Sequence, residues 1–356
     1  MVSALVLSVL LGIPTEEIRT ALESNVESTR WQDKCEFVVV TEWERKGLGV
    51  FRQSARIRRD GSKLDFAGEL KKTDDNDFPG NATSRSINNG EWYLNRTTST
   101  GRKKLTGGRS SKLAEASNRE IESSSYGFPL DGYFAGTDGK KLSQILLESD
   151  ELTADTELID GRQCLAISGT TRYGKIKICL DAEFGHTLRF ARISKGLGDI
   201  YSGAQFGEHR DTTGLRSWTG EVNGVTVEKV GEYFIPVSGT FVMENTGAAN
   251  AQFSVGFKRS DFNLSPDFAG TDAFQMDFDE GARVSDFDKP ESQIAYIWQN
   301  GDMHPEGAAG LPTAVDRAGF HTAPVARNRI YWLLAVNIVV LIGAVAWFQL
   351  SRAKVK

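Results

Sequence analysis

The chain has 356 residues and a formal net charge of −5, so it is long enough for one or two sizeable hydrophobic cores. Basic residues occur in short clusters, such as residues 56–59 and 102–104, which we interpret as solvated strand ends. Binding to a phosphate backbone needs clustered Lys and Arg, so the composition excludes a nucleic-acid partner. The 36 Gly and 20 Phe, against only 9 Pro, favour a domain of many short strands joined by glycine turns.

The N-terminal segment, residues 2–13, is apolar but too short to span a membrane. Its length is that of the hydrophobic region of a signal peptide, although no positively charged residue precedes it. Two interpretations stay open for residues 1–14: they are the remnant of a signal peptide, or they start the first helix.

An amphipathic helix is predicted over residues 15–28, because Ile18, Leu22 and Val26 recur at intervals of four. Thr15 is in place to cap its N-terminus, and acidic residues follow in the first turn.

Beyond this helix the apolar period changes to two, which predicts antiparallel strands joined by short turns. We expect strands at residues 36–43, 50–58, 64–70, 86–95 with a turn at 89–90, 187–194, 219–230, 232–237, 239–244, 252–259 and 294–299. Polar residues predict loops at 73–84 and 97–111, and short apolar runs predict helices at 113–121 and 140–147. The expected fold class is α+β, mainly β with a few helices.

A β-hairpin is predicted at residues 162–180. In the expected register four pairs of residues face each other: Gly169 and Gly174, Ile167 and Ile176, Leu165 and Ile178, and Cys164 and Cys179. Directly opposed cysteines lie close enough for a disulfide, which would agree with an oxidising compartment, so a disulfide and two free thiols both stay open. Cys35 is left over and is expected to behave as a small apolar residue.

The segment 330–350 carries no charge, and as a helix it would be about 32 Å long, which matches the hydrocarbon core of a bilayer. Aromatic residues stand at both its ends, and a short basic tail, residues 351–356, follows. We therefore predict a transmembrane helix with a cytoplasmic tail, preceded by a Gly/Ala/Pro linker at 303–329. The protein is expected to be a single-pass protein of the cytoplasmic (inner) membrane, with the bulk of the chain extracytoplasmic, in the periplasm. A buried core helix is the alternative interpretation.

Four stretches of the sequence follow the pattern of a known family: the helix with Ile18, Leu22 and Val26, the strand and turn at 57–61 (IRRDG), the run 160–189 with DAEFG at its turn, and the end at 274–286 (FQMDFDEGARVSD). In these stretches the chain resembles the LolA-like and RseB-like superfamily of periplasmic lipoprotein carriers and sensors. It departs from the family carriers by its membrane anchor and by a longer stretch at 195–237. Anchoring favours a fixed acceptor, sensor or scaffold over a shuttling carrier.

The resemblance implies a domain over residues 15–302 shaped as a curved antiparallel sheet, or half-barrel, which is covered by helices and accepts acyl chains on its concave apolar face. The residues that it places on this ligand-binding face are Phe37, Val39, Trp43, Phe66, Trp92, Leu94, Leu165, Ile167, Ile176 and Ile178. The same alternation is typical of an ordinary closed core, so the two interpretations differ in the volume under the sheet.

The histidines are scattered, and the sequence has no nucleophile elbow, phosphate-binding loop or dinucleotide-binding loop. His209 lies in a charged segment, residues 207–211, which is a solvated loop or, in a third class of function, holds the base of an envelope hydrolase. We expect a non-enzymatic, membrane-anchored extracytoplasmic domain that binds or senses lipid or lipoprotein acyl chains, without cofactor or metal. The alternative is an envelope structural or protein-interaction module with a closed core and no ligand.

Overall fold

The protein is seen in a computed structural model that describes residues 13, 15–45, 48–75, 78, 81–99, 106–110, 128–149, 151–209, 212–247, 250–275, 278, 280–286 and 296–305. The predicted transmembrane helix at 330–350, its tail, the helix expected at 113–121 and nearly all of residues 1–14 lie outside these ranges. Among the helices of the described residues, none combines the length and the apolar character needed to cross a membrane.

The chain divides into two compact units. Unit 1 comprises Met1–Gln32 and Glu122–Ser260, and unit 2 comprises Asp33–Ile121 and Asp261–Lys356. Each is built on a β-sheet, and both described α-helices belong to unit 1, so the prediction of a mainly β chain with a few helices is confirmed.

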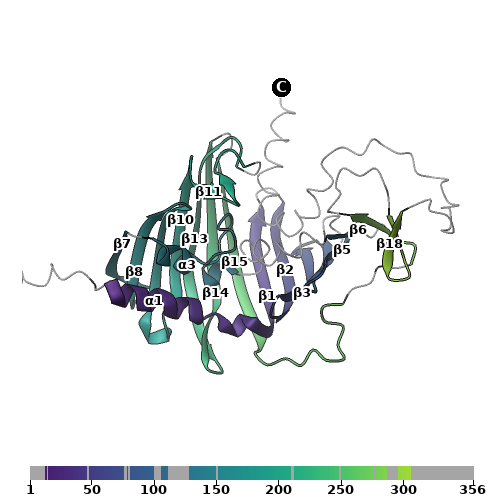
Figure 1. Ribbon diagram of the computed structural model, residues 1–356, viewed down its shortest axis with the longest axis horizontal. Helices are drawn as coiled ribbons and strands as arrows, with labels where there is room; N and C mark the ends of the chain where they lie inside the picture. Colours follow the sequence, from purple (N-terminus) through teal and green to yellow (C-terminus); the bar gives the residue numbers. More distant parts are fainter. Residues whose placement is uncertain are drawn as a thin grey trace, which may run out of the picture. The chain divides into compact units, whose positions relative to one another are not determined.

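The helices of unit 1 are α1 (Thr15–Glu27), the 3₁₀ turn η2 (Phe128–Asp131) and α3 (Leu142–Leu147). The amphipathic helix expected at residues 15–28 is α1, which lies across the strands of unit 1 (Figure 1). Its Ile18 and Leu22 are buried as the spacing predicts. A short 3₁₀ turn, η1 (Arg30–Asp33), leads from α1 towards unit 2.

Seven strands form the sheet of unit 1, and each pairs antiparallel with its neighbours in this sheet. In spatial order they are β15 (Ala251–Asn263), β14 (Tyr233–Gly247), β13 (Leu215–Val230), β10 (Thr187–Gly196), β9 (Gly174–Asp181), β8 (Arg162–Thr171) and β7 (Leu152–Ile159). A small ribbon of β11 (Ile200–Tyr201) and β12 (Ala204–Gln205) follows β10, and η3 (Ala182–Phe184) joins β9 to β10. β7 was not predicted from the sequence, and two strands were expected where β14 runs on as one.

The hairpin of β8 and β9 has a tighter turn than expected. Gly174 pairs with Thr171 rather than with Gly169. Gly174 has a φ of +112°, and a Cβ there would lie 2.2 Å from the carbonyl oxygen of Ser194, so this turn depends on glycine. The expected register is therefore wrong by two residues, a shift that leaves each side chain on its expected face.

The sheet of unit 2 is antiparallel except where β16 pairs in parallel with β6. In spatial order its strands are β1 (Lys34–Arg45), β2 (Gly49–Asp60), β3 (Lys63–Lys72), β4 (Ala82–Asn88), β5 (Tyr93–Ser99), β6 (Thr106–Ser110), β16 (Arg283–Asp286), β17 (Tyr296–Gln299) and β18 (Asp302–Pro305). The loops expected at 73–84 and 97–111 are too long, because β4 and β6 begin inside them, and β18 occupies the start of the expected linker.

The apolar face of the unit 1 sheet is packed against η2, α3 and the turn between them. The ring of Phe134 meets Phe241 of β14 with centroids 5.8 Å apart. A Cβ on Gly239 would lie 2.6 Å from Leu130, and one on Gly169 would lie 3.0 Å from Leu146. This part of unit 1 is therefore a closed hydrophobic core.

Buried polar side chains fix the helices of unit 1. Lys141 Nζ donates to the carbonyl oxygen of Asn25 at 2.7 Å, and Ser143 Oγ donates to Asn25 Oδ1 at 2.8 Å, so α3 is bonded to α1. Asp131 of η2 accepts from Gln32 Nε2 at 2.7 Å and from Arg259 Nη1 at 3.0 Å. Because unsatisfied buried groups are costly, these bonds specify one position of the helices.

Candidate functional site

Unit 2 has an apolar face on one side of β1, β2 and β3. Phe37, Ile57 and Phe66 are direct cross-strand neighbours, and each is only 1% exposed. Val39 lies on the same side, since residues two apart in a strand share a face. Trp43 also shares it and stacks on the ring of its cross-strand partner Phe51, with centroids 5.8 Å apart. Four of the predicted ligand-binding residues, Phe37, Val39, Trp43 and Phe66, are therefore brought together.

This face becomes polar towards β4 and β5. Phe66 lies opposite Ser86, which in turn lies opposite Asn95, and both polar residues are buried. Asn95 Nδ2 donates to Ser86 Oγ at 2.7 Å. Along this row the side chains are therefore apolar in β1, β2 and β3 and polar in β4 and β5.

Leu94 does not lie beside Phe66, which corrects the expectation that they share a face. Leu94 pairs with Ile87, which pairs with Asp65, so Leu94 lies on the opposite side of the sheet. There it belongs to a second hydrophobic cluster, against which Trp92 also packs, and whose other buried members are Ile87, Phe278, Val284 and Trp298. These two predicted residues therefore pack with the last strands of unit 2.

The hairpin residues expected on the ligand-binding face belong to unit 1. Ile167, Ile176 and Ile178 are at most 2% exposed, and Leu165 is half-buried. Leu165 pairs with Leu180, and Ile167 with Ile178, so all four do share one face, although in the shifted register. That face is the closed core of unit 1.

Cys164 and Cys179 are free cysteines in the same hairpin. Cys179 lies opposite Ala166, and Cys164 opposite Glu157, so the two are not directly opposed as expected. Burial raises the pKa of the Cys164 thiol to about 11 and that of the Cys179 thiol to about 12. Such thiols are poor nucleophiles near neutral pH.

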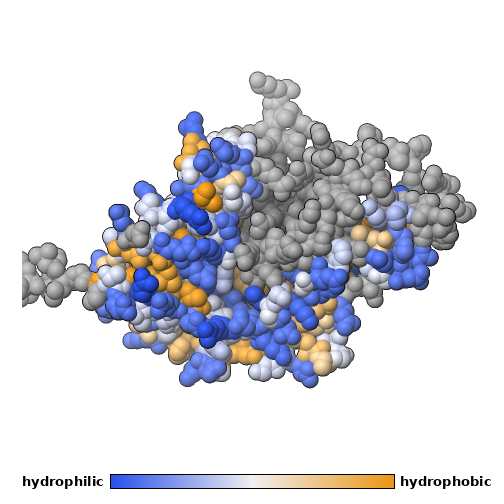
Figure 2. Space-filling view, in the orientation of Figure 1, coloured by the Kyte–Doolittle hydropathy of each residue, from blue (hydrophilic) through white to orange (hydrophobic). Residues whose placement is uncertain are grey.

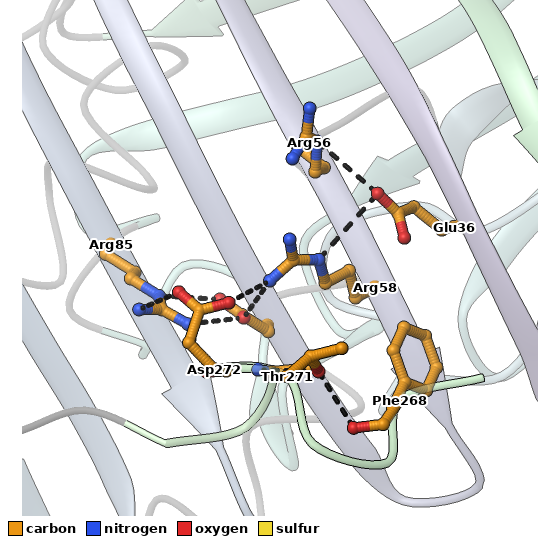
Figure 3. Close-up of polar contacts among 9 residues, drawn as sticks. Glu36, Arg56, Arg58, Arg85, Phe268, Thr271 and Asp272 are labelled. Atoms are coloured by element: carbon orange, nitrogen blue, oxygen red, sulfur yellow. Dashed lines mark hydrogen bonds and ion pairs between the residues drawn. The ribbon is translucent and has the colours of Figure 1, made fainter. Parts of the chain in front are cut away.

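The side of the unit 2 sheet opposite Phe37 carries a network of charges (Figure 3). Arg85 donates two hydrogen bonds to Asp65, from Nε to Oδ1 at 3.1 Å and from Nη2 to Oδ2 at 2.7 Å. Asp65 is only 1% exposed, and Arg58 Nη1 also approaches it at 3.4 Å. Glu36 is shared by Arg56 at 3.4 Å and Arg58 at 3.8 Å. The basic cluster at 56–59, interpreted from the sequence as solvated, thus supplies a partly buried arginine to this network.

The network ends in Asp272, which belongs to a segment that we term the strap, residues 265–275. Asp272 Oδ1 accepts from Arg58 Nη1 at 2.9 Å, and Oδ2 accepts from Arg85 Nη1 at 3.1 Å. Arg85 Nη2 also donates to the carbonyl oxygen of Asp272 at 2.7 Å. The hydrogen bond from Arg58 and the charges of both arginines hold the pKa of Asp272 below its usual range. This site was not predicted from the sequence, because its members are far apart in the chain.

A pocket of about 360 Å³ lies between the strap and the ends of β1, β2 and β3. Its polar lining includes a row of alternating charge, since Lys34 pairs with Asp60 and Asp60 pairs with Lys63 across the strands. The strap contributes Asp267, Phe268, Ala269, Ala273, Phe274 and Gln275, and Asn89 completes the lining. The pocket therefore offers groups for both signs of charge beside two aromatic rings.

His209 lies in the loop after β12, with its ring centroid 5.2 Å from that of Tyr201. Within the residues that the structure describes, no cluster of three or more His, Cys, Asp or Glu side chains could hold a metal ion.

Apolar residues also reach the surface of unit 1 (Figure 2), where Leu158 and Leu197 are each more than 70% exposed. Single exposed apolar side chains are ordinary on protein surfaces and do not define a site.

No protein-family model matches the sequence, and no curated protein matches it. The chain is similar to several solved structures. A DUF1329 family protein from Desulfovibrio piger has a TM-score of 0.38 at 11% identity, over 73% of this chain and 97% of that one. An outer membrane lipoprotein-sorting protein domain from Vibrio parahaemolyticus has a TM-score of 0.36 at 13% identity, over 72% and 95%. A LolA superfamily protein from Nitrosomonas europaea has a TM-score of 0.33 at 12% identity, over 71% and 94%. The last of these three proteins is described as a member of the LolA superfamily, the family that the sequence pattern resembles.

Proposed function

We propose that this chain is a non-enzymatic binding domain of half-barrel form that holds lipid or lipoprotein acyl chains against the apolar face of unit 2. The observation that carries the proposal is the row of Phe37, Ile57 and Phe66, which with Val39 and Trp43 makes most of one side of β1 to β3 apolar. The corresponding face of unit 1 is filled by Phe134, Leu130 and α3, so it is not the binding face. Apolar surfaces with a few polar groups at one end suit ligands that have both parts.

We also propose a location for the protein in the cell envelope. An exported chain would be anchored in the cytoplasmic membrane by residues 330–350, with the two units in the periplasm and the basic tail inside. Intact spheroplasts with a tag after Lys356 are treated with external protease. We expect the protease to digest the two units and to leave the tag intact. Digestion of the tag with protection of the units would overturn this placement.

The binding test uses the full chain, purified from membranes. Its copurifying lipids are extracted and identified by mass spectrometry, and displacement of a fluorescent fatty acid measures the site in competition with unlabelled acyl chains. We expect a saturable displacement with one class of site. A chain that carries no lipid and takes up no probe would remove the ligand from the proposal.

The second candidate function is an envelope structural or protein-interaction module with a closed core. The packing of unit 1 favours it, because apolar side chains cover the sheet closely: a Cβ on Gly239 would lie 2.6 Å from Leu130, and one on Gly169 would lie 3.0 Å from Leu146. In that case the chain would bind no acyl probe, and cross-linking in membranes would capture a protein partner.

A further inference from the structure

We propose that Arg58 and Arg85 form a binding site for a phosphate group, and that Asp272 of the strap is an internal ligand which such a phosphate displaces. The geometry that points to this site is the set of hydrogen bonds that the Asp272 carboxylate accepts. Its two oxygens are held by two different guanidinium groups, at 2.9 Å from Arg58 and 3.1 Å from Arg85. Two arginines that each bind one oxygen of the same anion suit phosphate as well as carboxylate.

The two arginines are held in place without Asp272. Asp65 lies beneath them, 1% exposed, and binds Arg85 through both of its oxygens. Arg58 is further placed by Asp65 and by Glu36. Arg58 and Arg85 are themselves only 17% and 24% exposed, so few side-chain rotamers remain to be lost when an anion binds. The site is therefore built before any ligand arrives.

The charge of the cluster also favours an anion. Arg58, Arg85 and Asp65 together carry one net positive charge, and Glu36 is shared with Arg56. Asp272 neutralises this charge in the observed state. If the strap carboxylate leaves, the charge is restored and is available to a phosphate.

Asp272 has the features of a ligand that can leave. Its side chain is 68% exposed, whereas that of Asp65 is buried. The strap also keeps its own fold through internal contacts: Thr271 Oγ1 donates to the carbonyl oxygen of Phe268 at 2.8 Å, and the rings of Phe268 and Phe274 meet with centroids 5.1 Å apart. The strap can thus detach from the arginines as one piece.

The strap links the arginine site to the pocket. Residues on both sides of Asp272, among them Phe268 and Phe274, line the pocket, and Lys34 and Lys63 line it from the sheet, together with Asp60 and Asp267. If Asp272 leaves the arginines, the strap can move away from the sheet and the pocket opens. The site is separate from the apolar face of unit 2, so its test does not depend on acyl binding.

The test compares two variants of the full chain that each remove one negative charge from the strap. Asp272→Asn removes the internal ligand. Asp267→Asn is the matched control, because Asp267 lines the pocket and its Oδ1 accepts a hydrogen bond from the backbone amide of Ala269. The melting temperature is followed against inorganic phosphate at constant ionic strength. Because the internal ligand lowers the fraction of binding-competent protein, Asp272→Asn should respond at a phosphate concentration about tenfold lower than the parent chain or Asp267→Asn.

Adding Arg85→Met to Asp272→Asn should abolish the response. If Asp272→Asn responds no better than Asp267→Asn, the proposal is wrong and Asp272 is a structural ion pair only. The parent chain gives an independent check: phosphate should increase chymotrypsin cleavage at Phe268 and Phe274 in the strap, and unchanged cleavage at saturating phosphate would also overturn the proposal.

The source of the phosphate is separated by a second probe. Short-chain phosphatidic acid is compared with phosphatidylcholine of the same chain length in the same assay. A response to phosphatidic acid at lower concentration than to inorganic phosphate supports the site as one for a lipid headgroup. Equal or weaker response to the lipid supports it as a site for free phosphate.

Discussion

Arg259 of β15 and Asp131 of η2 form an ion pair in which neither side chain has any solvent exposure, with Nη1 of the arginine 3.0 Å from Oδ1 of the aspartate. Removal of one partner leaves a buried charge without compensation. We therefore expect Asp131→Asn to lower the free energy of unfolding by about 3–5 kcal/mol. The double variant Asp131→Leu with Arg259→Met should lose less than the sum of the two single variants, as urea unfolding and a double-mutant cycle can show.

The exposed pair of Arg162 and Glu183, 3.2 Å apart, is the matched control. The Glu183 side chain is 80% exposed, so Glu183→Gln should change the free energy of unfolding by less than about 1 kcal/mol. Similar losses for Asp131→Asn and Glu183→Gln would contradict the assignment of Asp131 to the fixed core.

Because two lysines are buried, we expect the free energy of unfolding to rise with pH. Burial lowers the pKa of Lys141 to about 7 from its ordinary value of 10.5, against the opposing charge of Asp131. It lowers that of Lys195 to about 7 as well, against Asp199 and Asp138. Between the folded and the unfolded pKa values the unfolded chain binds more protons, so the free energy of unfolding increases as pH rises through this window.

We expect an increase of about 1 kcal/mol or more per pH unit between pH 7 and pH 9, measured by urea unfolding. Lys195→Met should flatten this dependence in part, since Lys141 remains. Stability that does not rise over the same window would show that the hydrogen bonds from Lys195 Nζ to the carbonyl oxygens of Gly136, Tyr173 and Ile200 keep the ammonium charged in the folded state.

The local elements of this fold could be predicted from periodicity, because one face of each element is buried. The period of four identified α1, and the period of two identified β1, β2 and β3 within a few residues of their bounds. β7 was missed because it lies at one end of the order, and its residues are half-buried or exposed, so they show no clear apolar alternation.

The partners across the sheet could not be predicted with the same success. The resemblance placed Leu94 and Phe66 on one ligand-binding face, yet the residues on the face of Phe66 in β4 and β5 are Ser86 and Asn95. Leu94 is instead buried by residues such as Trp298, some two hundred positions later in the sequence. The Arg58, Arg85 and Asp272 site was missed for the same reason, since only tertiary contacts bring its members together.

The cysteines give a test of the shifted hairpin register. Cys164 and Cys179 are free and buried, and their raised pKa values keep them protonated at pH 8. Without reductant, both should resist iodoacetamide in the native chain and be alkylated fully in urea, as peptide mass spectrometry can measure. The buried Cys35 serves as the internal control, since it lies in β1, outside the hairpin. Labelling of Cys35 alone in urea, with the other two labelled only after reduction, would show that a disulfide joins the hairpin.

The apolar face of unit 2 is either a wall of ligand space or a closed core, and Ala55 separates the two. It lies between Val39 and Gly68 across the strands, is 2% exposed, and shares the face of Phe37 and Phe66. If ligand space lies above it, Ala55→Phe should place its ring there, weaken displacement of the fluorescent fatty acid by about tenfold or more, and leave the melting temperature of the lipid-free chain nearly unchanged. In a closed core the added ring would overpack the interior and lower the free energy of unfolding by about 1–3 kcal/mol. Ser54→Phe, at the exposed neighbouring position on the charged face, controls for the added ring and should change neither quantity. A loss of stability in Ala55→Phe without any acyl binding by the parent chain would favour the interaction module over the acyl-binding domain.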